Sequence, residues 1–326
     1  MLLSRAADSL YWMSRYLERA EHSARLINVH LNTMVGQSPH AGMNQWQRLY
    51  ESLHTPVPRN EAEEVEVKNP YEAIRGLTFD RKNPNSLISC ISAARENARQ
   101  IREQLSSEMW EQVNRIYLNL NQRSFDQVWN DQPHAFFREV ENQTFLFQGI
   151  SGSSMMHDEG WRFIQIGSYL ERTIATATLV DAHYQLYESD RLDPLPTDEY
   201  LQWVGLLKSC SAFEAYCRTY TPTLHTGNIA EFLLLNSVLP RSLHFCADRM
   251  HQAVQQIAGI TGNKHSQRLV RLTGRLQAKA RYGQIDEILD DGLHIFLEDV
   301  IQQCGQIHQA LFQAYVDYPV ELEMNG

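Results

Sequence analysis

The sequence predicts an all-α protein: a multi-helix bundle made of two tandem helical repeats related by a pseudo-twofold axis. Apolar residues recur at helical spacings through most of the 326 residues, and no stretch alternates with a period of two between hairpin turns. The four residues from Tyr16 to Arg19 also recur unchanged from Tyr169 to Arg172, 153 positions later. We therefore expect a first repeat over residues 1–155 and a second over 156–326, packed together as one compact unit.

Further matches at almost the same offset support a tandem duplication. Identical residues pair Trp46 with Trp203 at an offset of 157 and Cys90 with Cys246 at an offset of 156. A duplicated chain tends to pack as two similar halves, so both Glu-Arg pairs are expected to converge on one central site.

The first repeat opens with a long amphipathic helix. Its apolar stripe consists of Leu10, Met13, Leu17, Ala20, Ala24, Ile27, Leu31 and Met34. This pattern predicts a helix of roughly 30 residues, about 45 Å long. Gly36 and Pro39 end it.

The counterpart of this helix is predicted over about residues 156–188. Between Phe163 and Val180 the only charged residues are Glu171 and Arg172, so this pair is expected inside the molecule. Further helices are predicted over residues 42–54, 84–106, 108–121, 133–150, 197–220, 227–236, 240–259, 265–282 and 285–316. Asn83 and Thr197 have the side chains of helix N-caps. The segment 54–82 is expected to be an irregular loop with short helical pieces, and residues 149–154 are expected to join the halves.

Composition limits the classes of function. A net charge of −10 disfavours nonspecific nucleic-acid binding, which needs a clustered basic surface. Five cysteines without a Cys-x-x-Cys pair favour reduced thiols. The chain shows neither a signal-peptide pattern nor 18 consecutive apolar residues. These features predict a soluble cytoplasmic protein that binds neither nucleic acid nor membrane.

The repeated Glu-Arg pairs are the main candidates for chemistry. Neighbouring residues on a helix point about 100° apart, so each member is expected to find its partner on another helix. One interpretation is a structural network of buried ion pairs that fixes the register of the helices. The other is a cleft in which Glu18 and Glu171 are catalytic groups that bind an amine or transfer a proton. In that cleft the substrate-binding residues would be Arg15, Arg19, His22 and Arg172.

A second candidate group lies between residues 95 and 102. Arg95, Arg99 and Arg102 fall on one helical face, which suits an anionic ligand, although a solvated helix surface fits equally well. Asn97 is a poor helix former inside this helix, so we predict a hydrogen-bonding role for it. We count Arg95, Asn97 and Arg99 among the substrate-binding candidates.

Neither a metal nor a cofactor is expected. A di-iron bundle needs two Glu-x-x-His motifs and two further glutamates. The second half has Ile174 and Ala175 where the first has Glu21 and His22. The glycine-rich motifs that bind nucleotides and the Gly-x-Ser-x-Gly nucleophile motif are missing from the sequence.

Several segments together resemble the bacterial Alpha-E family, an all-helical domain named for a Glu-Arg motif. They are the segments 10–21, 94–99, 108–114, 160–172, 231–235 and 240–242. Members of this family are typically encoded beside, or fused to, circularly permuted ATP-grasp proteins. ATP-grasp enzymes join a carboxylate to an amine through an acyl phosphate. The segment 54–82 departs from the family, because relatives tend to be more regular there.

The resemblance implies a partnership with such a ligase in making or modifying a small peptide or amino-acid-derived amide. The central Glu/Arg cleft would then bind the charged amino-acid or peptide substrate. The alternative is a noncatalytic helical adaptor that docks the ligase and uses its Glu-Arg network only to hold its own fold. Whether the chain is itself an enzyme stays open at this point.

Overall fold

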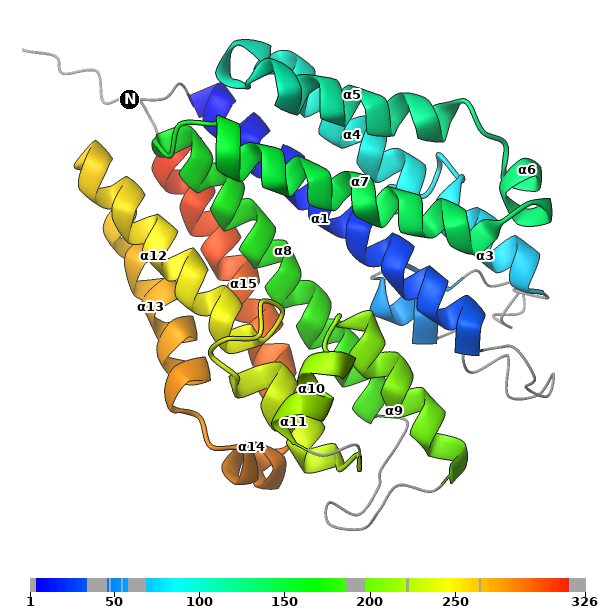
Figure 1. The fold of residues 1–326 in the computed structure, drawn as a ribbon. Helices are drawn as coiled ribbons and strands as arrows, with labels where there is room; N and C mark the ends of the chain where they lie inside the picture. Colours follow the sequence, from blue (N-terminus) through cyan, green and yellow to red (C-terminus); the bar gives the residue numbers. More distant parts are fainter. Residues whose placement is uncertain are drawn as a thin grey trace, which may run out of the picture.

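Figure 1 shows the computed structural model, in which the described residues fold mainly into helices. The structure describes residues 4–33, 46, 48–53, 55–57, 69–185, 197–220, 223–263 and 265–316. No strand occurs among these residues, so the predicted all-α class is confirmed. The helices are α1 Ser4–Thr33, α3 Pro70–Thr78, α4 Leu87–Gln100, η1 Arg102–Gln104, α5 Ser107–Asn121, α6 Phe125–Asn130, α7 Pro133–Ser154, α8 Glu159–Tyr184, α9 Thr197–Ser209, α10 Phe213–Thr219, α11 Thr226–Leu235, α12 Leu243–Thr261, α13 Ser266–Tyr282, α14 Ile285–Asp291 and α15 Leu293–Tyr315.

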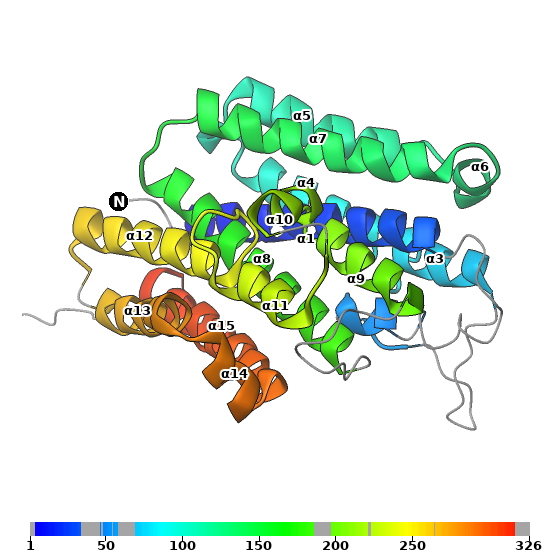
Figure 2. The same cartoon turned by 60° about the horizontal axis from the view of Figure 1, so that its bottom comes forward.

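Two long helices, α1 and α8, pack against each other at the centre of the molecule (Figure 1). On one side, α1 joins α4, α5 and α7 in a ring in which each helix contacts the next. On the other side, α8 joins α12, α13 and α15 in a second ring of the same kind. Figure 2 shows the result as layers, with α5 and α7 at one outer face, α13 and α15 at the other, and α1 and α8 between them.

A glycine permits the close approach of the two central helices. A Cβ atom added at Gly167 of α8 would lie 2.5 Å from the backbone carbonyl oxygen of Tyr11 in α1. It would also meet the hydroxyl of Ser14, which donates a hydrogen bond of 2.8 Å to that same carbonyl. Since a side chain would push the helices apart, the missing Cβ at position 167 sets the distance between α1 and α8.

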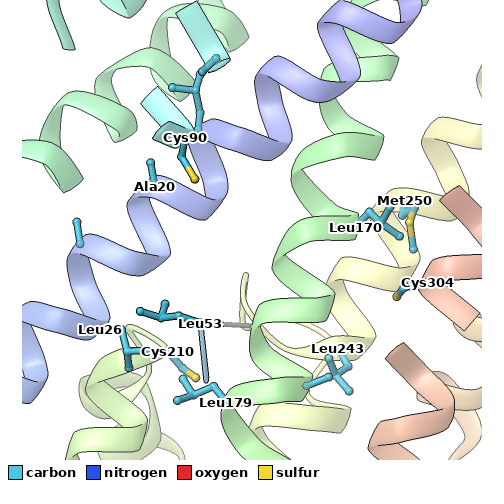
Figure 3. Close-up of a cluster of buried hydrophobic side chains, with 14 of the residues drawn as sticks. Ala20, Leu26, Leu53, Cys90, Leu170, Leu179, Cys210, Leu243, Met250 and Cys304 are labelled. Carbon is cyan, nitrogen blue, oxygen red and sulfur yellow. The ribbon is translucent and has the colours of Figure 1, made fainter. Parts of the chain in front are cut away.

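The hydrophobic core continues through both rings. Figure 3 shows Ala20 and Cys90 between α1 and α4, and Leu170, Met250 and Cys304 among α8, α12 and α15. All five side chains are buried. From Leu10 to Ile27 the apolar stripe predicted for α1 is buried in this core, and Leu31 packs against it. Met34 and the predicted helix end at Gly36 and Pro39 lie outside the described residues. The buried cysteines serve as small apolar residues in the core. All five cysteines of the chain are free thiols.

Several predicted helix boundaries need correction. The helix predicted over 197–220 is two helices, because Ser211 adopts a left-handed backbone with φ of 50° between α9 and α10. Gly292, with φ of 106°, likewise separates α14 from α15 within the predicted helix 285–316. The N-cap of α4 is Ser86, whose side chain accepts from the amide of Ser89. Asn83 instead accepts from the amide of Asn85, in a turn before the helix.

The predicted joint at residues 149–154 is also wrong in detail, because these residues form the last turns of α7. The chain turns after them, and Asp158 then caps α8 by accepting from the amides of Gly160 and Trp161. The segment 54–82, predicted to be a loop with short helical pieces, contains the short helix α3, as expected. Residues 54 and 58–68 of that segment lie outside the described residues. None of the described helices is long and apolar enough to span a bilayer.

Candidate functional site

The two Glu-Arg pairs meet where α1 crosses α8, and each pair is bonded to the other helix. Arg172 of α8 donates from Nε and Nη2 to the two carboxylate oxygens of Glu18, at 2.7 and 2.9 Å. In return, Glu171 of α8 accepts from Nε of Arg15 at 2.7 Å and from Nε of Arg19 at 2.6 Å. The predicted pairing between helices is therefore confirmed.

Burial makes these ion pairs unusual. The side chains of Glu18 and Glu171 are only 1% and 7% exposed, and that of Arg172 is 11% exposed. The prediction that the second pair lies inside the molecule is thus confirmed. A buried charge is tolerated only when it is paired and hydrogen-bonded, and here each carboxylate receives at least two charged donors.

Arginines keep both glutamates ionised. Burial alone would raise the pKa of Glu18, but the charge and hydrogen bonds of Arg172, with further arginines nearby, lower it to about 2. Burial acts in the same direction on Glu171, yet Arg15 and Arg19 bring its pKa below the usual value. At neutral pH both side chains are therefore carboxylates.

The network extends to three residues that are not among the predicted site residues. Arg241, which precedes α12, donates to Glu18 at 3.3 Å and to Glu21 at 2.7 Å. Arg25 donates to the other oxygen of Glu21 and, at 2.6 Å, to the backbone carbonyl of Ser209. Glu21 could have been found from its place one turn after Glu18, whereas only the fold brings Arg241 to α1.

His22 stands beside this network as a neutral imidazole. Its Nδ1 lies 3.3 Å from Nη2 of Arg25, and its Nε2 is buried with no hydrogen-bond partner. Burial, reinforced by the positive charges of Arg25 and Arg241, lowers the pKa of His22 to about 3. Because a guanidinium can only donate, Nδ1 must accept and the single ring proton resides on Nε2.

A cavity of about 300 Å³ opens on the Glu171 side of the network. Three of the predicted substrate-binding residues line it, and Asn85 joins them by accepting from Nη1 of Arg19 at 2.7 Å. Apolar residues of α8 and α15 also line it. The lining residues are Arg15, Arg19, His22, Ser52, Leu53, Asn85, Glu171, Ile174, Ala175, Ile301 and Gly305.

A second cavity of about 230 Å³ lies on the Glu18 side, among α1, α7 and α8. Gln148 of α7 borders it and donates to Glu18 at 3.1 Å. Arg172 is the predicted substrate-binding residue that lines this cavity. The two glutamates thus border different cavities on either side of the crossing of α1 and α8.

The second predicted group of binding residues stays outside this arrangement. Arg95 donates to the side chain of Asn114 at 2.8 Å and lies over the rings of Trp110 and Tyr117. Asn97 bonds to a carbonyl of its own helix, and Arg99 pairs with Glu96 at the surface. Arg95, Asn97 and Arg99 line neither of the two cavities. Arg95 and Arg99 share the helix α4, but their side chains do not reach the crossing of α1 and α8.

Fold and site together define an all-helical protein organised around a buried Glu-Arg network. The chain belongs to the Alpha-E family, described as "a predicted alpha-helical domain with a conserved ER motif", which it matches over residues 2–316. Uncharacterised proteins of Mycobacterium bovis and Mycobacterium tuberculosis are each 23% identical to it over 331 residues. The match covers 94% of this chain but 35% of each relative, so the chain spans about a third of their length. No solved structure matches the chain.

Proposed function

We propose that this protein works with a circularly permuted ATP-grasp ligase to make or modify a small peptide or amino-acid-derived amide. In this proposal the 300 Å³ cavity receives the charged end of the substrate. The observation that carries it is the lining of this cavity, which combines two arginines fixed by Glu171 with apolar residues. A site of this kind can orient an anionic group while leaving the rest of the molecule in contact with apolar side chains.

The roles of the glutamates follow from their ionisation. A carboxylate with a pKa near 2, like that of Glu18, has little tendency to take up a proton at neutral pH. Glu18 and Glu171 can still orient the arginines and attract the amine of a substrate. The catalytic role predicted for the two residues stays a prediction, in which electrostatic attraction is favoured over proton transfer.

We also propose that the molecule consists of two repeats related by a pseudo-twofold axis. Similar contacts at nearly the same offset support this proposal. His30 lies edge-on to Trp46 at 4.5 Å, as His183 does to Trp203. Arg19 and Arg172 each donate to the glutamate of the other half and each lie over a tyrosine, Tyr16 and Tyr169 respectively.

A co-expression experiment tests the proposed partnership. The protein is co-expressed with the ATP-grasp protein encoded nearest to its gene, purified through a tag on one chain, and incubated with ATP and mixed amino acids. We expect the two chains to purify together and mass spectrometry to detect an amide product that requires both. Purification of each chain alone, with no product from the mixture, would contradict the proposal.

The alternative function is that of an adaptor without chemistry of its own. It is favoured by the pairing within the network, where both oxygens of Glu18 and both of Glu171 accept charged donors. Glu18→Gln and Arg172→Lys separate the two functions in the same assay. Loss of product from folded complexes supports the cleft, whereas unchanged product per folded complex supports the adaptor.

A further inference from the structure

The 300 Å³ cavity contains hydrogen-bond donors that the protein itself does not satisfy. Arg15 uses Nε and Nη1 for Glu171 and Tyr11, and Arg19 uses Nε and Nη1 for Glu171 and Asn85. Nη2 of either arginine has no partner among the described residues. The Nε2–H of His22 is a third donor without an acceptor. The buried Nε2–H of His22 is unfavourable without an acceptor, and Ser52 lines the same cavity with a buried hydroxyl that also has no partner. Together with the two Nη2 groups, these donors favour a ligand that brings acceptors.

The charge of the network indicates what kind of acceptor would balance it. Five arginines, at positions 15, 19, 25, 172 and 241, are connected to Glu18, Glu21 and Glu171. Glu141 lies close enough to Arg25 to interact with it, and burial raises its pKa to about 6, so that it is mostly ionised at pH 7. Five positive and four negative charges leave one positive charge in a largely buried cluster. A single negative charge would neutralise it.

The apolar residues that line the cavity limit the choice of ligand further. Ile174 and Ala175 of α8 and Ile301 of α15 also line the cavity. These three apolar side chains gain free energy by covering aliphatic groups, and none of them can stabilise a second charge. Gly305 borders the same space, and a Cβ added there meets no atom within 4 Å.

We infer that this cavity binds a monocarboxylate with a short aliphatic body, its oxygens accepting from Nη2 of Arg15 and Arg19 and from Nε2–H of His22. The inference rests on the proposed function, in which this cavity receives the charged end of the substrate, and names that end as a carboxylate. Inorganic phosphate is disfavoured, because it carries more than one charge near neutral pH and has no aliphatic part.

Calorimetric titration of the full-length protein with butyrate tests the inference directly. Inorganic phosphate and butylamine serve as comparison probes of different charge. We expect butyrate to bind with a stoichiometry of one and more tightly than phosphate, and butylamine not to bind. Tighter binding of phosphate, or no binding of butyrate, would overturn the inference.

Two glycine variants control for folding. Gly305→Leu adds an aliphatic side chain at the border of the cavity, where a Cβ atom meets no other atom within 4 Å, and leucine favours a helix more than glycine does. Gly259→Leu makes the same change at an exposed position of α12, where an added Cβ also meets nothing within 4 Å. Butyrate binding should be lost in the first variant and retained in the second. Equal binding by both would place the ligand elsewhere and refute the assignment.

His22→Leu isolates the contribution of the imidazole donor. Hydrogen bonds to charged groups correspond to roughly ten- to a hundred-fold in affinity, so butyrate should bind weaker by about that factor. In the parent protein, the Nε2–H resonance of His22 should shift when butyrate is added. An unchanged affinity together with an unmoved resonance would remove His22 from the site.

The outcomes distinguish this inference from the proposed function. If butyrate binds but no product forms with the ATP-grasp protein, the carboxylate site stands and the proposed function fails. If product forms while butyrate does not bind and Gly305→Leu is fully active, the partnership with the ligase stands, whereas the carboxylate site and the role of this cavity in it both fail.

Discussion

At the scale of single residues, the pairing of Glu171 decides whether two arginines can stay buried. Arg15 and Arg19 both direct Nε to this one carboxylate. The charge of Glu171 raises the pKa of both guanidiniums, against a burial effect that lowers it. The fold therefore needs the glutamate even if catalysis does not.

Replacing this glutamate should be strongly destabilising. Glu171→Ala leaves the two guanidiniums without their carboxylate, and breaking a buried pair in this way lowers the free energy of unfolding by about 3–5 kcal/mol. Urea unfolding followed by circular dichroism measures the change. Glu96→Ala is the matched control, because Glu96 pairs with Arg99 at the exposed surface and should matter little. Similar losses in both variants would contradict the prediction.

Stability should also fall as the solution becomes acidic. Burial lowers the pKa of His22 and of His30 to about 3, below the value of about 6.5 expected for the unfolded chain. Because the folded pKa is depressed, the stability from each neutral imidazole is present above pH 6.5. It is lost as the pH falls from 6.5 toward 3, by at most about 1.4 kcal/mol per pH unit and group. Glu141, with its raised pKa, acts in the opposite direction between about pH 6 and 4.5.

Urea unfolding at pH 7.5, 6.0 and 5.0 measures this dependence. The free energy of unfolding should decrease at each step. His30→Leu should reduce the slope of this free energy against pH by the contribution of about one proton taken up on unfolding. Below about pH 4.5, Glu18 adds a further loss, since its folded pKa is also depressed. A free energy of unfolding that stays constant between pH 7.5 and 5.0 would show that the histidines are not held neutral.

At the scale of the helices, the crossing of α1 and α8 depends on the absence of one side chain. Gly167→Ala would normally favour a helix, since alanine is the better helix former by about 1 kcal/mol. Here the new Cβ would lie 2.5 Å from the carbonyl oxygen of Tyr11, and backbone cannot move away as a flexible side chain can. We therefore predict a net loss of stability of about 1–3 kcal/mol from overpacking.

Gly149→Ala provides the matched control in α7. A Cβ added there meets no atom within 4 Å, so the variant should be more stable by about 0.5–1 kcal/mol. Thermal unfolding of both variants measures whether each substitution lowers or raises the stability of the protein. If Gly167→Ala were as stabilising as the control, the helices would not approach as closely as the structure shows.

At the scale of the whole molecule, neither half can complete its charged network alone. Glu18 and Glu21 lie in the first half, but their partners Arg172 and Arg241 lie in the second. Residues 1–155 expressed alone should therefore fail to form a stable, cooperatively unfolding protein. Circular dichroism and denaturant unfolding check this expectation.

Co-expression of residues 1–155 with residues 156–326 should restore the fold. The cut falls in the turn between α7 and α8, next to Met156, which is 78% exposed, so little packing is lost. The two fragments should elute together in size-exclusion chromatography. Independent folding of the first fragment would mean that the contact between α1 and α8 is not essential to it.

Sequence patterns were sufficient to predict most of the helices. The apolar stripe of α1 and the uncharged stretch around Glu171 report burial directly, because a helix buried on several sides has little room for unpaired charge. Boundaries were predicted less well where one residue changes the backbone direction, as Ser211 and Gly292 do. Residues 149–154 show the reverse case, since glycines and serines that favour a loop are held in a helix by its other residues.

Sequence patterns alone were enough to establish that the protein is helical, that it belongs with the Alpha-E family, and that Glu171 and Arg172 lie inside. These conclusions depend on local periodicity and on the free energy of burying charge, which can be read from neighbouring residues. Only the tertiary structure decided that Arg241 joins the network and that Arg95 does not. It also decided that the two glutamates border different cavities. Such facts depend on how distant helices cross, and here the crossing is set by a close backbone contact at Gly167.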